Sequence, residues 1–471
     1  MSTPNTHEGP ARILSHLRAC AAHGASVFFI GVGGVMMSSL ALLTARAEHP
    51  VLGSDRARTA VTDELTREGV TVLYGHAAEN IPDDCGLVVY TVAISEDNPE
   101  YTEALTRGIP CVSRADYLGA LMTGYVHRVG VAGMHGKSTC TSMCAQIFVD
   151  ADADPTVLSG ATTACLNGAY RIGGKEHFIF EACEYMDSFL DFNPSIAVIL
   201  NAEMEHVDYF KSMEQIRSSF GKYAALTGES GFAVVNCDDP EVMASVEQYV
   251  GGTVTFGIEH EYATFRAVDL TYHDGYPAFD ILLDGEFFSH VQLCVPGKHN
   301  VYNALAAVAC AHLCGICAED IARGLHAFGG AGRRMEYKGK LNGAPVFDDY
   351  GHHPTEVAAT LQGMAQMGYD RIFCVFQPHT YSRTAQLADQ FADAFAAADH
   401  VILVDIYAAR EKESKGISSA KLASKIGGRA KYVPEYEKVA EMLTQEVSER
   451  DAVVVMGAGD VYRLFEYLDL T

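Results

Sequence analysis

The sequence lacks long apolar runs and is short of positive charge. None of its 471 residues belongs to an uninterrupted apolar stretch of about 18, the length that crosses a bilayer. Acidic residues number 60 against 34 basic ones, for a formal net charge of −26. Nucleic acids and anionic membrane surfaces select a basic protein face. We therefore expect neither a nucleic acid nor a membrane as partner.

A cysteine framework and an export signal are also missing. The 13 cysteines are scattered through apolar runs rather than spaced as pairs, and no basic segment followed by an apolar core opens the chain. Reduced thiols are typical of the cytosol, so we expect a soluble cytoplasmic protein. Low-complexity tracts and short-period repeats are absent too. A chain of this length then predicts about three domains, each with its own core.

The strongest local signal is an apolar strand that runs into a glycine turn at residues 129–140. Gly133 and Gly136 allow the backbone N–H groups to point inward, and the following helix directs its positive end to the same place. Lys137 can then reach the outer phosphates of a nucleotide, and Ser138 can hold Mg²⁺. A Walker A loop has a glycine where Val131 stands, so the match is incomplete. The motif predicts a nucleotide phosphate site.

A second glycine turn follows the first predicted strand, in a region of alternating strands and helices from about residue 25 to 122. Gly31, Gly33 and Gly34 begin a helix there, which indicates a nucleotide diphosphate site in a parallel α/β sheet. The dinucleotide fingerprint has a third glycine where Met36 stands. Asp55 lies after the second strand, where it contacts a ribose or else serves as a loop carboxylate or a helix cap.

Polar residues also follow two strands of the middle region. Glu181 ends an apolar strand at residues 178–180, and His206 lies beyond the next strand at 196–200. The carboxyl ends of parallel strands meet at one edge of a sheet. Both residues are therefore placed to join Ser138 around Mg²⁺ on phosphate oxygens.

A β-rich stretch at residues 253–296 carries two Asp-Gly pairs, at 274–275 and 284–285, which predict a small antiparallel excursion. The helix that follows starts with His299, Asn300 and Asn303. Their polar groups are close enough in sequence to converge on one flat heterocycle. The alternative is that Asn300 serves as the N-cap of the helix.

Glycines at 329, 330 and 332 form a flexible link before Arg333 and Arg334, which can clamp phosphate when domains close. Strands are predicted after it at 345–349, 371–377, 400–405 and 452–456. Two of these strands end in His with Asp or Arg, at 348–356 and 377–384. The vicinal His352 and His353 suggest a metal site, or else His353 caps the helix that Pro354 opens.

From about residue 25 onward the chain resembles the Mur ligase family. The matches include the glycine turn at 31–34 with Gly53-Ser54-Asp55, and Gly-Met-His-Gly-Lys-Ser-Thr at 133–139. Further matches are Glu-Ala-Cys-Glu at 181–184, the segment from Asn201 to Asp208, Gly-Lys-His-Asn at 297–300 with Asn303, Gly-Arg-Arg at 332–334, the block at 348–356, and Phe-Gln-Pro-His at 376–379.

The resemblance implies an α/β protein of three domains. These are an N-terminal Rossmann-like domain for a UDP-sugar (residues 1–122), a central P-loop ATPase with a mainly parallel sheet (123–332), and a C-terminal Rossmann-like α/β domain for an amino acid (333–471). The implied reaction is ATP- and Mg²⁺-dependent joining of L-alanine to the lactyl carboxylate of UDP-N-acetylmuramate through an acyl phosphate. A monomer or homodimer is expected.

The resemblance also assigns residues to roles. The catalytic residues are Lys137, Glu181 and His206. The metal ligands are Ser138, Glu181 and His206. The ATP site comprises Gly133, His135, Gly136, Lys137, Ser138, Thr139, His299, Asn300, Asn303, Arg334 and Asp349. The UDP-sugar site comprises Gly31, Gly33, Gly34, Ser54, Asp55 and Asn201. The amino-acid site comprises Tyr350, His352, His379 and Arg383.

Three alternatives remain open from the sequence. A recycling ligase that joins a whole peptide to the same UDP-sugar shares the Asp-Asp-x-x-His-His-Pro-Thr block, although Phe-Gln-Pro-His at 376–379 argues against it. An NAD-dependent oxidoreductase built on Gly31 to Gly34 leaves Lys137 and Glu181 unexplained. A P-loop switch or motor leaves the C-terminal His and Arg residues without a purpose.

Overall fold

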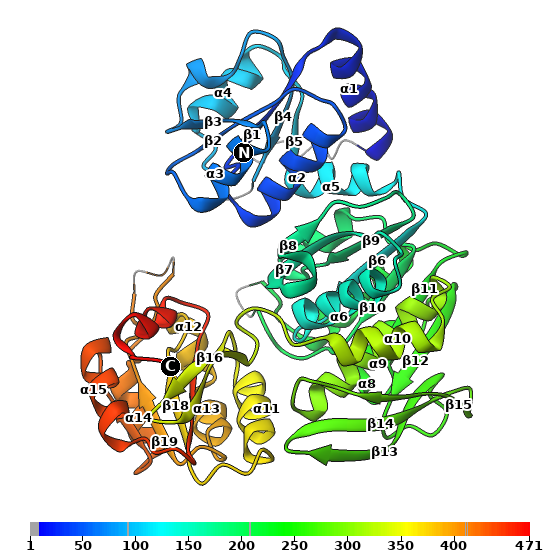
Figure 1. The fold of residues 1–471 in the computed structure, drawn as a ribbon. Helices are drawn as coiled ribbons and strands as arrows, with labels where there is room; N and C mark the ends of the chain where they lie inside the picture. The colour runs from blue at the N-terminus through cyan, green and yellow to red at the C-terminus, as the bar shows by residue number, and fades with distance from the viewer. Residues whose placement is uncertain (1–8, 92–93, 207–208, 410, 412) are drawn as a thin grey trace.

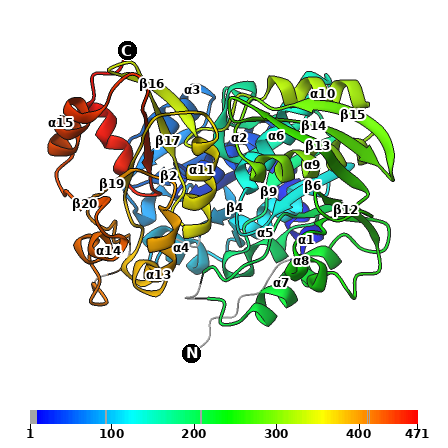
Figure 2. The ribbon, with the colours of Figure 1, turned by 90° about the horizontal axis from the view of Figure 1, so that it is seen from below.

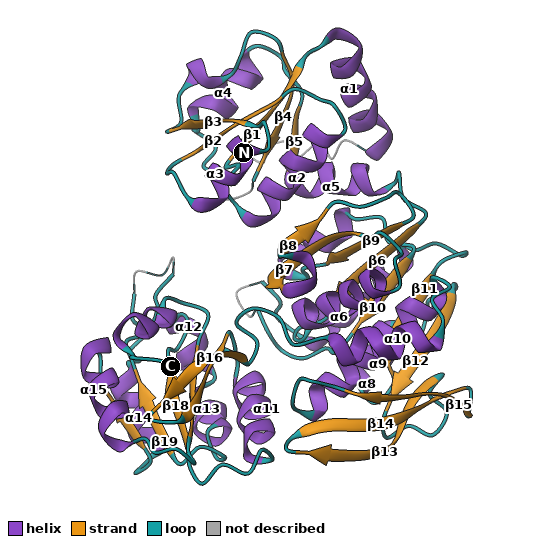
Figure 3. Ribbon diagram, viewed as in Figure 1, coloured by secondary structure: helices purple, strands orange, loops and turns teal. Residues whose placement is uncertain are grey.

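The computed structural model describes residues 9–471 apart from 92–93, 207–208, 410 and 412, and it contains three sheets (Figures 1 and 3). Each sheet is built from one continuous length of chain and is covered by helices, as the α/β prediction requires. Parallel pairs predominate in all three sheets. The predicted fold class is confirmed. The boundaries drawn near residues 123 and 333 stay predictions.

The N-terminal sheet is fully parallel, with the strand order β3-β2-β1-β4-β5. The central strand β1 is buried at every residue, as its Ser-Val-Phe-Phe-Ile sequence predicts. The order reverses between β1 and β4, which is where such sheets bind ligands. The elements are α1 (Pro10–His23), β1 (Ser26–Ile30), α2 (Val35–Arg46), β2 (Val51–Asp55), α3 (Ala60–Arg67), β3 (Thr71–Tyr74), η1 (Ala78–Asn80), β4 (Cys85–Tyr90), α4 (Pro99–Thr106), β5 (Cys111–Ser113) and α5 (Arg114–Met122).

The central sheet has ten strands in the order β15-β14-β13-β12-β11-β10-β6-β9-β7-β8. Its first elements are β6 (His127–Ala132), α6 (Lys137–Asp150), β7 (Thr156–Thr163), η2 (Ala164–Leu166), β8 (Gly168–Arg171), β9 (His177–Glu181), η3 (Tyr185–Asp191), β10 (Ile196–Ile199), α7 (Met213–Ala225) and β11 (Phe232–Asn236). The rest are α8 (Pro240–Ser245), β12 (Gly252–Gly257), β13 (Phe265–His273), β14 (Tyr276–Leu283), β15 (Glu286–Gln292), α9 (Lys298–Leu313) and α10 (Ala318–Ala327).

The antiparallel excursion predicted at residues 253–296 is confirmed for β13, β14 and β15. Asp274 and Gly275 join the first two of these strands, with φ angles of 52° and 84°. Two successive positive φ angles are the signature of a type I′ hairpin turn. Asp284 and Gly285 repeat the pattern at the next turn, with φ angles of 51° and 86°.

The C-terminal sheet has the order β16-β17-β21-β18-β19-β20, and only β16 among its described strands pairs antiparallel. All four predicted strands are present there as β17, β18, β19 and β21. The elements are β16 (Glu336–Leu341), β17 (Ala344–Asp349), α11 (Pro354–Ala365), β18 (Ile372–Phe376), α12 (Tyr381–Gln386), α13 (Ala388–Ala394), β19 (His400–Leu403), α14 (Ser419–Ile426), β20 (Ala430–Tyr432), α15 (Tyr436–Glu446), β21 (Ala452–Met456) and η4 (Val461–Tyr467).

The central unit contacts both of its neighbours (Figures 1 and 2). A Cβ atom at Gly119 of α5 would lie 2.2 Å from the carbonyl oxygen of Asp191, so only glycine permits this approach between the N-terminal and central units. On the other side, Gly363 of α11 lies against Gly297, which precedes α9. The C-terminal ends of β6, β9 and β10 therefore face the seam with the C-terminal unit. Within the described part of the chain, every helix is too short or too polar to cross a membrane.

Candidate active site

The phosphate loop lies between β6, a buried strand near the middle of the central sheet, and the N-terminus of α6. Gly133 and Gly136 have φ angles of 141° and 81°, which L side chains rarely adopt. A Cβ atom at Gly136 would lie 2.5 Å from Oδ1 of Asn303, so this glycine also makes room for α9. The backbone N–H groups that begin α6 are thus presented to an anion, as the sequence predicted.

Lys137, the first residue of α6, is held inside the loop it follows. Its Nζ donates to the carbonyl oxygens of Gly133 and Met134 at 2.7 and 3.1 Å, and it lies 3.0 Å from Oε2 of Glu184. Burial is the largest single effect and disfavours the ammonium group, but Glu184, Cys183 and Glu181 together outweigh it and raise the pKa of Lys137. The lysine is therefore charged and mostly buried before any nucleotide is bound.

Glu184 is a functional residue that sequence reasoning missed. Its side chain is fully buried, and its Oε1 also lies 2.9 Å from Nε2 of His206. Burial opposes ionisation here, but the charge of Lys137 and the contact with His206 together lower the pKa of Glu184. The available signal was its spacing, because Glu181 ends the apolar strand β9 and Glu184 lies three residues further on.

Ser138 and Glu181 meet as predicted. The Ser138 hydroxyl donates to Oε2 of Glu181 at 2.7 Å, and the backbone N–H of Gly160 donates to the same oxygen at 3.0 Å. His206 bonds Glu184 rather than Glu181, although all three predicted metal ligands line one cavity of about 510 Å³. That cavity offers one hydroxyl, one carboxylate and one imidazole beside the phosphate loop.

A second cavity of about 360 Å³ collects the residues predicted for the rest of ATP. His135, Gly136, Thr139, His299, Asn300, Asn303, Arg334 and Asp349 all line it. Arg334 and Asp349 belong to the chain beyond the central sheet, so the cavity is completed by the C-terminal unit. The structure therefore brings His299, Asn300 and Asn303 together around one cavity, as the sequence predicted.

The alternative role of Asn300 as an N-cap is wrong. Gly297 occupies the cap position of α9, and Asn300 is the third residue of the helix. Its amide donates to the carbonyl oxygen of Pro296 at 2.7 Å and its Oδ1 accepts from Asn303 at 3.1 Å. Both asparagines are buried, so the cavity wall is fixed by their mutual hydrogen bonds.

Desolvation by the surrounding protein dominates the titration of two groups in this cavity, the exposed His299 and the buried Asp349. It lowers the pKa of His299 to about 4, with the charge of Arg334 acting in the same direction. It raises the pKa of Asp349 to about 6, although the nearby Arg334 opposes this. Asp349 also accepts from the backbone N–H groups of Met335 and Gly351. His299 is therefore neutral at pH 7, and Asp349 is a carboxylate poised near its pKa.

His135 joins the phosphate loop to the C-terminal unit. Its ring forms an ion pair with Glu203, and its Nδ1 lies 3.2 Å from Oε1 of Glu356 on α11. Burial lowers its basicity, but the two carboxylates outweigh this and raise the pKa of His135 to about 10. Thr355 also donates to Glu203 across the seam at 3.0 Å. Sequence reasoning gave no role to Glu203 or Glu356, although both lie inside segments that match the family.

Asn201 lies beside His135 rather than in the N-terminal unit. Its Oδ1 accepts from the backbone N–H of His135 at 2.8 Å, and its amide donates to the carbonyl oxygen of the same residue at 3.0 Å. It also lines the smaller cavity, whereas the end of the same matching segment, at residues 207–208, lies outside the described residues. This position favours a role in shaping the phosphate loop over the predicted contact with a UDP-sugar.

The four residues predicted for the amino acid gather at the ends of β17 and β18. The ring of His352 lies 5.5 Å from that of Tyr350 and 5.7 Å from that of His379. Arg383 lies 3.2 Å from Nδ1 of His379 and donates to Oε1 of Glu205 from Nε at 3.1 Å and from Nη2 at 2.6 Å. A guanidinium and three aromatic rings thus form one face of the seam.

Glu205 was also missed by sequence reasoning, and it belongs to the central unit. Burial opposes its ionisation, but the charges of Arg383 and His353 lower the pKa of Glu205 to about 2. His353 caps α11, which is one of the two roles that the sequence left open for it. Its Nδ1 accepts from the backbone N–H of Thr355 at 3.4 Å.

The glycine turn of the N-terminal unit has the geometry that its sequence predicted. Gly31 has a φ angle of 82°, and Gly34 directly precedes α2. The backbone N–H of Gly33 donates to Oδ2 of Asp55 at 2.8 Å, so this carboxylate braces the turn. Ser54 donates to Oε2 of Glu100 at 2.7 Å.

Glu100 is a buried polar centre that the sequence did not reveal. Besides Ser54, it accepts from Asn80 at 2.6 Å and lies 2.7 Å from Nδ1 of His76. These residues come from four separate elements or loops, so no short motif contains them. The network fixes Ser54 and His76 beside the glycine turn.

Three family models match successive parts of the chain. They are described as "Mur ligase family, catalytic domain" for residues 26–126, "Mur ligase middle domain" for 131–311, and "Mur ligase, glutamate ligase domain" for 333–459. Together they cover each of the three sheets and the cavities between the second and the third.

Proteins of known name match over nearly the whole length. The chain is 43% identical to the UDP-N-acetylmuramate–L-alanine ligase of Acetivibrio thermocellus, over 93% of this chain and 94% of that protein. It is 42% identical to the enzyme of the same name from Clostridium novyi, over 93% of this chain and 96% of that protein.

Solved structures agree with this similarity. The UDP-N-acetylmuramate-alanine ligase of Thermotoga maritima aligns with a TM-score of 0.78 at 27% identity, covering 94% of this chain and 98% of that one. A murein peptide ligase from Psychrobacter arcticus aligns with a TM-score of 0.70 at 23% identity, with the same coverages, and shares the fold.

Proposed function

The chain belongs to the Mur ligase family, and from that membership we infer that it is the ATP-dependent ligase that joins L-alanine to UDP-N-acetylmuramate. The observation that carries this inference is the similarity to enzymes of that activity, at 42–43% identity over 93% of the chain. The product is a precursor of peptidoglycan. Family membership argues against the NAD-dependent oxidoreductase and the P-loop motor.

The reaction has two steps that the site must support. A lactyl carboxylate oxygen attacks the γ-phosphorus of ATP, and ADP leaves. The amine nitrogen of L-alanine then attacks the carbonyl carbon of the acyl phosphate, and inorganic phosphate leaves after the amine has lost its proton. A carboxylate must therefore approach a strongly negative phosphate chain, which requires fixed positive groups.

Lys137 and the N-terminus of α6 are proposed to hold the β- and γ-phosphates. The lysine is already charged and lies inside the loop, and ATP binding would exchange one of its contacts with Glu184 or a loop carbonyl for a phosphate oxygen. His299, Asn300 and Asn303 are proposed to form the adenine-side wall, where the neutral imidazole and paired amides suit a flat heterocycle. Arg334 and Asp349 would approach ATP from the C-terminal unit.

The donor set at Ser138, Glu181 and His206 fits Mg²⁺, because a hydroxyl and a carboxylate converge at 2.7 Å and both are hard oxygen ligands. When bound, Mg²⁺ screens the phosphate charge from the incoming carboxylate. Glu184 holds His206 at the rim of the same cavity. These four side chains thus organise the phosphate end of the site.

Arg383 is proposed to bind the carboxylate of L-alanine, with Tyr350, His352 and His379 around the small side chain. Its two bonds to Glu205 support this role, because a carboxylate is the group that the guanidinium already holds. For the UDP-sugar we propose the turn at Gly31, Gly33 and Gly34 with Ser54 and Asp55. The oligomeric state, a monomer or a homodimer, stays a prediction.

Phosphate release tests the proposal. Purified protein is assayed with ATP, Mg²⁺ and UDP-N-acetylmuramate, and with L-alanine, glycine, L-serine or the tripeptide of the recycling reaction as acceptor. We expect release that requires both the UDP-sugar and L-alanine, with a product whose mass equals their sum less one water. Release that ignores the UDP-sugar would contradict the ligase activity. Preference for the tripeptide would identify the recycling ligase instead.

A further inference from the structure

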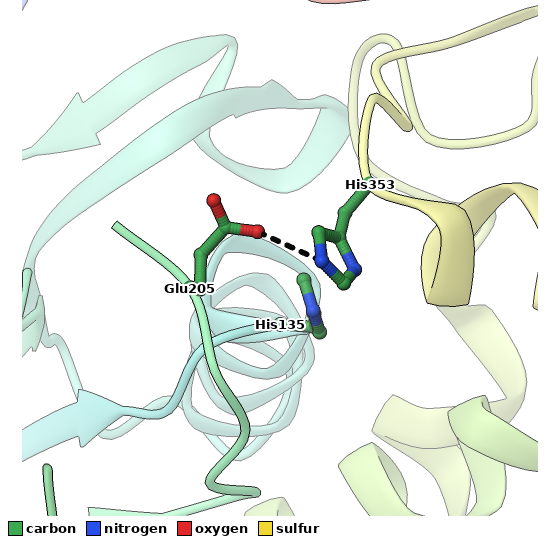
Figure 4. A group of neighbouring side chains, drawn as sticks. All are labelled: His135, Glu205 and His353. Atoms are coloured by element: carbon green, nitrogen blue, oxygen red, sulfur yellow. Dashed lines mark ion pairs between the residues drawn. The ribbon is translucent and has the colours of Figure 1, made fainter. Parts of the chain in front are cut away.

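Three side chains converge at the seam and form a set of possible metal ligands, a role that the proposed reaction gives to none of them. His135, Glu205 and His353 each offer one ligand atom, and these atoms all lie within 4.8 Å of one another. Figure 4 shows that they come from three places: the phosphate loop, the segment after β10, and the start of α11. The cluster therefore joins the central unit to the C-terminal unit.

Two of these atoms are buried without a hydrogen-bond partner. His353 is 2% exposed and Glu205 is 6% exposed. Nε2 of His353 and Oε2 of Glu205 point at each other across 3.3 Å, yet neither has a hydrogen bond within the described residues. Buried polar atoms are nearly always satisfied in folded proteins, and an ion-binding role is one usual explanation for exceptions.

We propose that His135, Glu205 and His353 form a binding site for a divalent metal ion of the zinc class. Two imidazole nitrogens and one carboxylate oxygen suit Zn²⁺, Co²⁺ or Ni²⁺, whereas Mg²⁺ prefers oxygen ligands throughout. Two donors at about 2.0–2.1 Å from a tetrahedral zinc ion lie roughly 3.3 Å apart. The separation of the Glu205 and His353 atoms is 3.3 Å.

The surroundings hold the ligands in place and favour a cation. Arg383 fixes Oε1 of Glu205 at 2.6 Å and leaves Oε2 free to face His353. Glu356 lies 3.2 Å from Nδ1 of His135, which leaves Nε2 of that ring for the ion. Outer carboxylates of this kind orient metal-bound histidines.

Glu203 is a fourth candidate ligand. It forms an ion pair with Nε2 of His135, and its Oε1 lies 3.9 Å from Nδ1 of His353. On binding, the ion replaces the Nε2 proton that His135 directs at Glu203, and this proton is released to solvent. The ion also replaces the Nε2 proton of His353, whose ring then carries its proton on Nδ1 and donates it to Glu203 instead of accepting the long cap bond from Thr355. The ion then clamps the two units together across the seam.

The site differs from the Mg²⁺ site proposed above in both residues and chemistry. Ser138, Glu181 and His206 supply two oxygen donors and lie on the phosphate side of the larger cavity. None of the three is a ligand in the zinc-class site. Metal binding at the zinc-class site can be measured without ATP or the UDP-sugar. A protein that binds no metal there could still be the proposed ligase, and a protein without ligase activity could still bind the metal.

Cobalt titration tests the proposal on the whole protein. Protein stripped by a chelator is titrated with Co²⁺ in excess Mg²⁺ and without nucleotide, and binding is followed by the visible absorption of the ion in a tetrahedral site. Zn²⁺ is then added to displace it. We expect one equivalent of Co²⁺, released by Zn²⁺ and retained in excess Mg²⁺.

Two variants remove one ligand each. His353→Asn deletes the Nε2 ligand and keeps a side chain that caps α11 well, and Glu205→Gln replaces the carboxylate by an amide of the same shape. Loss of an outer partner alone typically weakens metal binding 10- to 100-fold, so each variant should lose roughly 100-fold in affinity. Circular dichroism checks that both variants fold.

The controls are His290→Asn and Glu181→Gln. His290 is an exposed histidine on β15 paired with Asp280, and Glu181 belongs to the Mg²⁺ site, so both variants should bind Co²⁺ as wild type does. The proposal is overturned if wild type takes up no stoichiometric Co²⁺ or if excess Mg²⁺ abolishes the signal. Undiminished binding by either His353→Asn or Glu205→Gln, or lost binding in either control, overturns it as well.

Discussion

Replacing Lys137 by Met separates the structural role of this lysine from its proposed phosphate role. The side chain is 13% exposed, and its ammonium lies 3.0 Å from a carboxylate oxygen of the fully buried Glu184. Met keeps the length of the stem but removes the charge. Glu184 is then left with His206 as its one ion-pair partner among the described residues.

The size of the effect follows from burial. Removing one partner of a buried ion pair destabilises a protein by about 3–5 kcal/mol, because the other charge stays buried without compensation. We expect Lys137→Met to lose about 3 kcal/mol, at the lower end, since His206 still contacts Glu184 at 2.9 Å. Adding Glu184→Gln removes the stranded charge, so the double variant should recover most of this loss.

Activity should behave differently from stability. Loss of one preorganised donor to the transition state typically lowers kcat by about 10²–10³-fold. We expect at least this loss in Lys137→Met and no recovery in the double variant, because the second change restores no positive charge at the phosphates. Phosphate release reports activity, and urea unfolding by circular dichroism reports stability, since the chain has no tryptophan to follow by fluorescence.

Lys438→Met is the matched control for this cycle. Lys438 pairs with Glu435 at 3.0 Å on an exposed face of α15, and such a pair contributes less than about 1 kcal/mol. Lys438→Met should therefore change the free energy of unfolding by no more than that amount, and it should leave activity unchanged. The reasoning is refuted if Lys137→Met keeps activity within tenfold of wild type, or if the double variant is no more stable than the single one.

Three further changes test the seam. Gly136→Ala puts a methyl carbon 2.5 Å from a side-chain oxygen on α9 at a φ angle of 81°, and should weaken ATP binding measured by calorimetry at least about tenfold, at a strain of about 1–2 kcal/mol. His299 has its pKa lowered to about 4, so the unfolded chain binds more protons between pH 6.5 and 4, and the free energy of unfolding should fall as the pH drops through that window. Because the His299 side chain is exposed, solvent screening should keep this loss below about 1 kcal/mol. Arg383→Ala should raise the KM for L-alanine by roughly 100-fold, because a buried charged donor is lost, and should leave the Kd for ATP within a few-fold.

Each of these three predictions has a control variant or an outcome that would contradict it. Gly228→Ala, at a φ angle of 69° with open space around the added carbon, should leave ATP binding unchanged. The acid-dependent loss should be smaller in His299→Gln, and an unchanged pH profile would contradict the burial argument. A rise in the Kd for ATP equal to the rise in the KM for L-alanine in Arg383→Ala would show that this residue acts on closure rather than on the amino acid.

The sequence predicted most of the elements because the information is local. Strands such as β1 and β18 are runs of apolar β-branched and aromatic residues, and the Asp-Gly pairs specify the turns beside β14. The phosphate loop is equally local, since glycine at positions 133 and 136 is required by φ angles that other residues avoid. The N-cap assigned to Asn300 failed because Gly297 ends the preceding loop three residues earlier.

The tertiary structure decided what these local pieces hold. Glu184, Glu203 and Glu205 are ordinary carboxylates in the sequence, and they acquire charged partners only when segments far apart in the chain are brought together. Glu205 meets Arg383 across 178 residues. A single sequence carries no signal for such pairs, since their energy depends on burial and distance rather than on spacing. The sequence by itself therefore determined the elements, the loop and the family, and folding alone decided which carboxylate holds each cation at the seam.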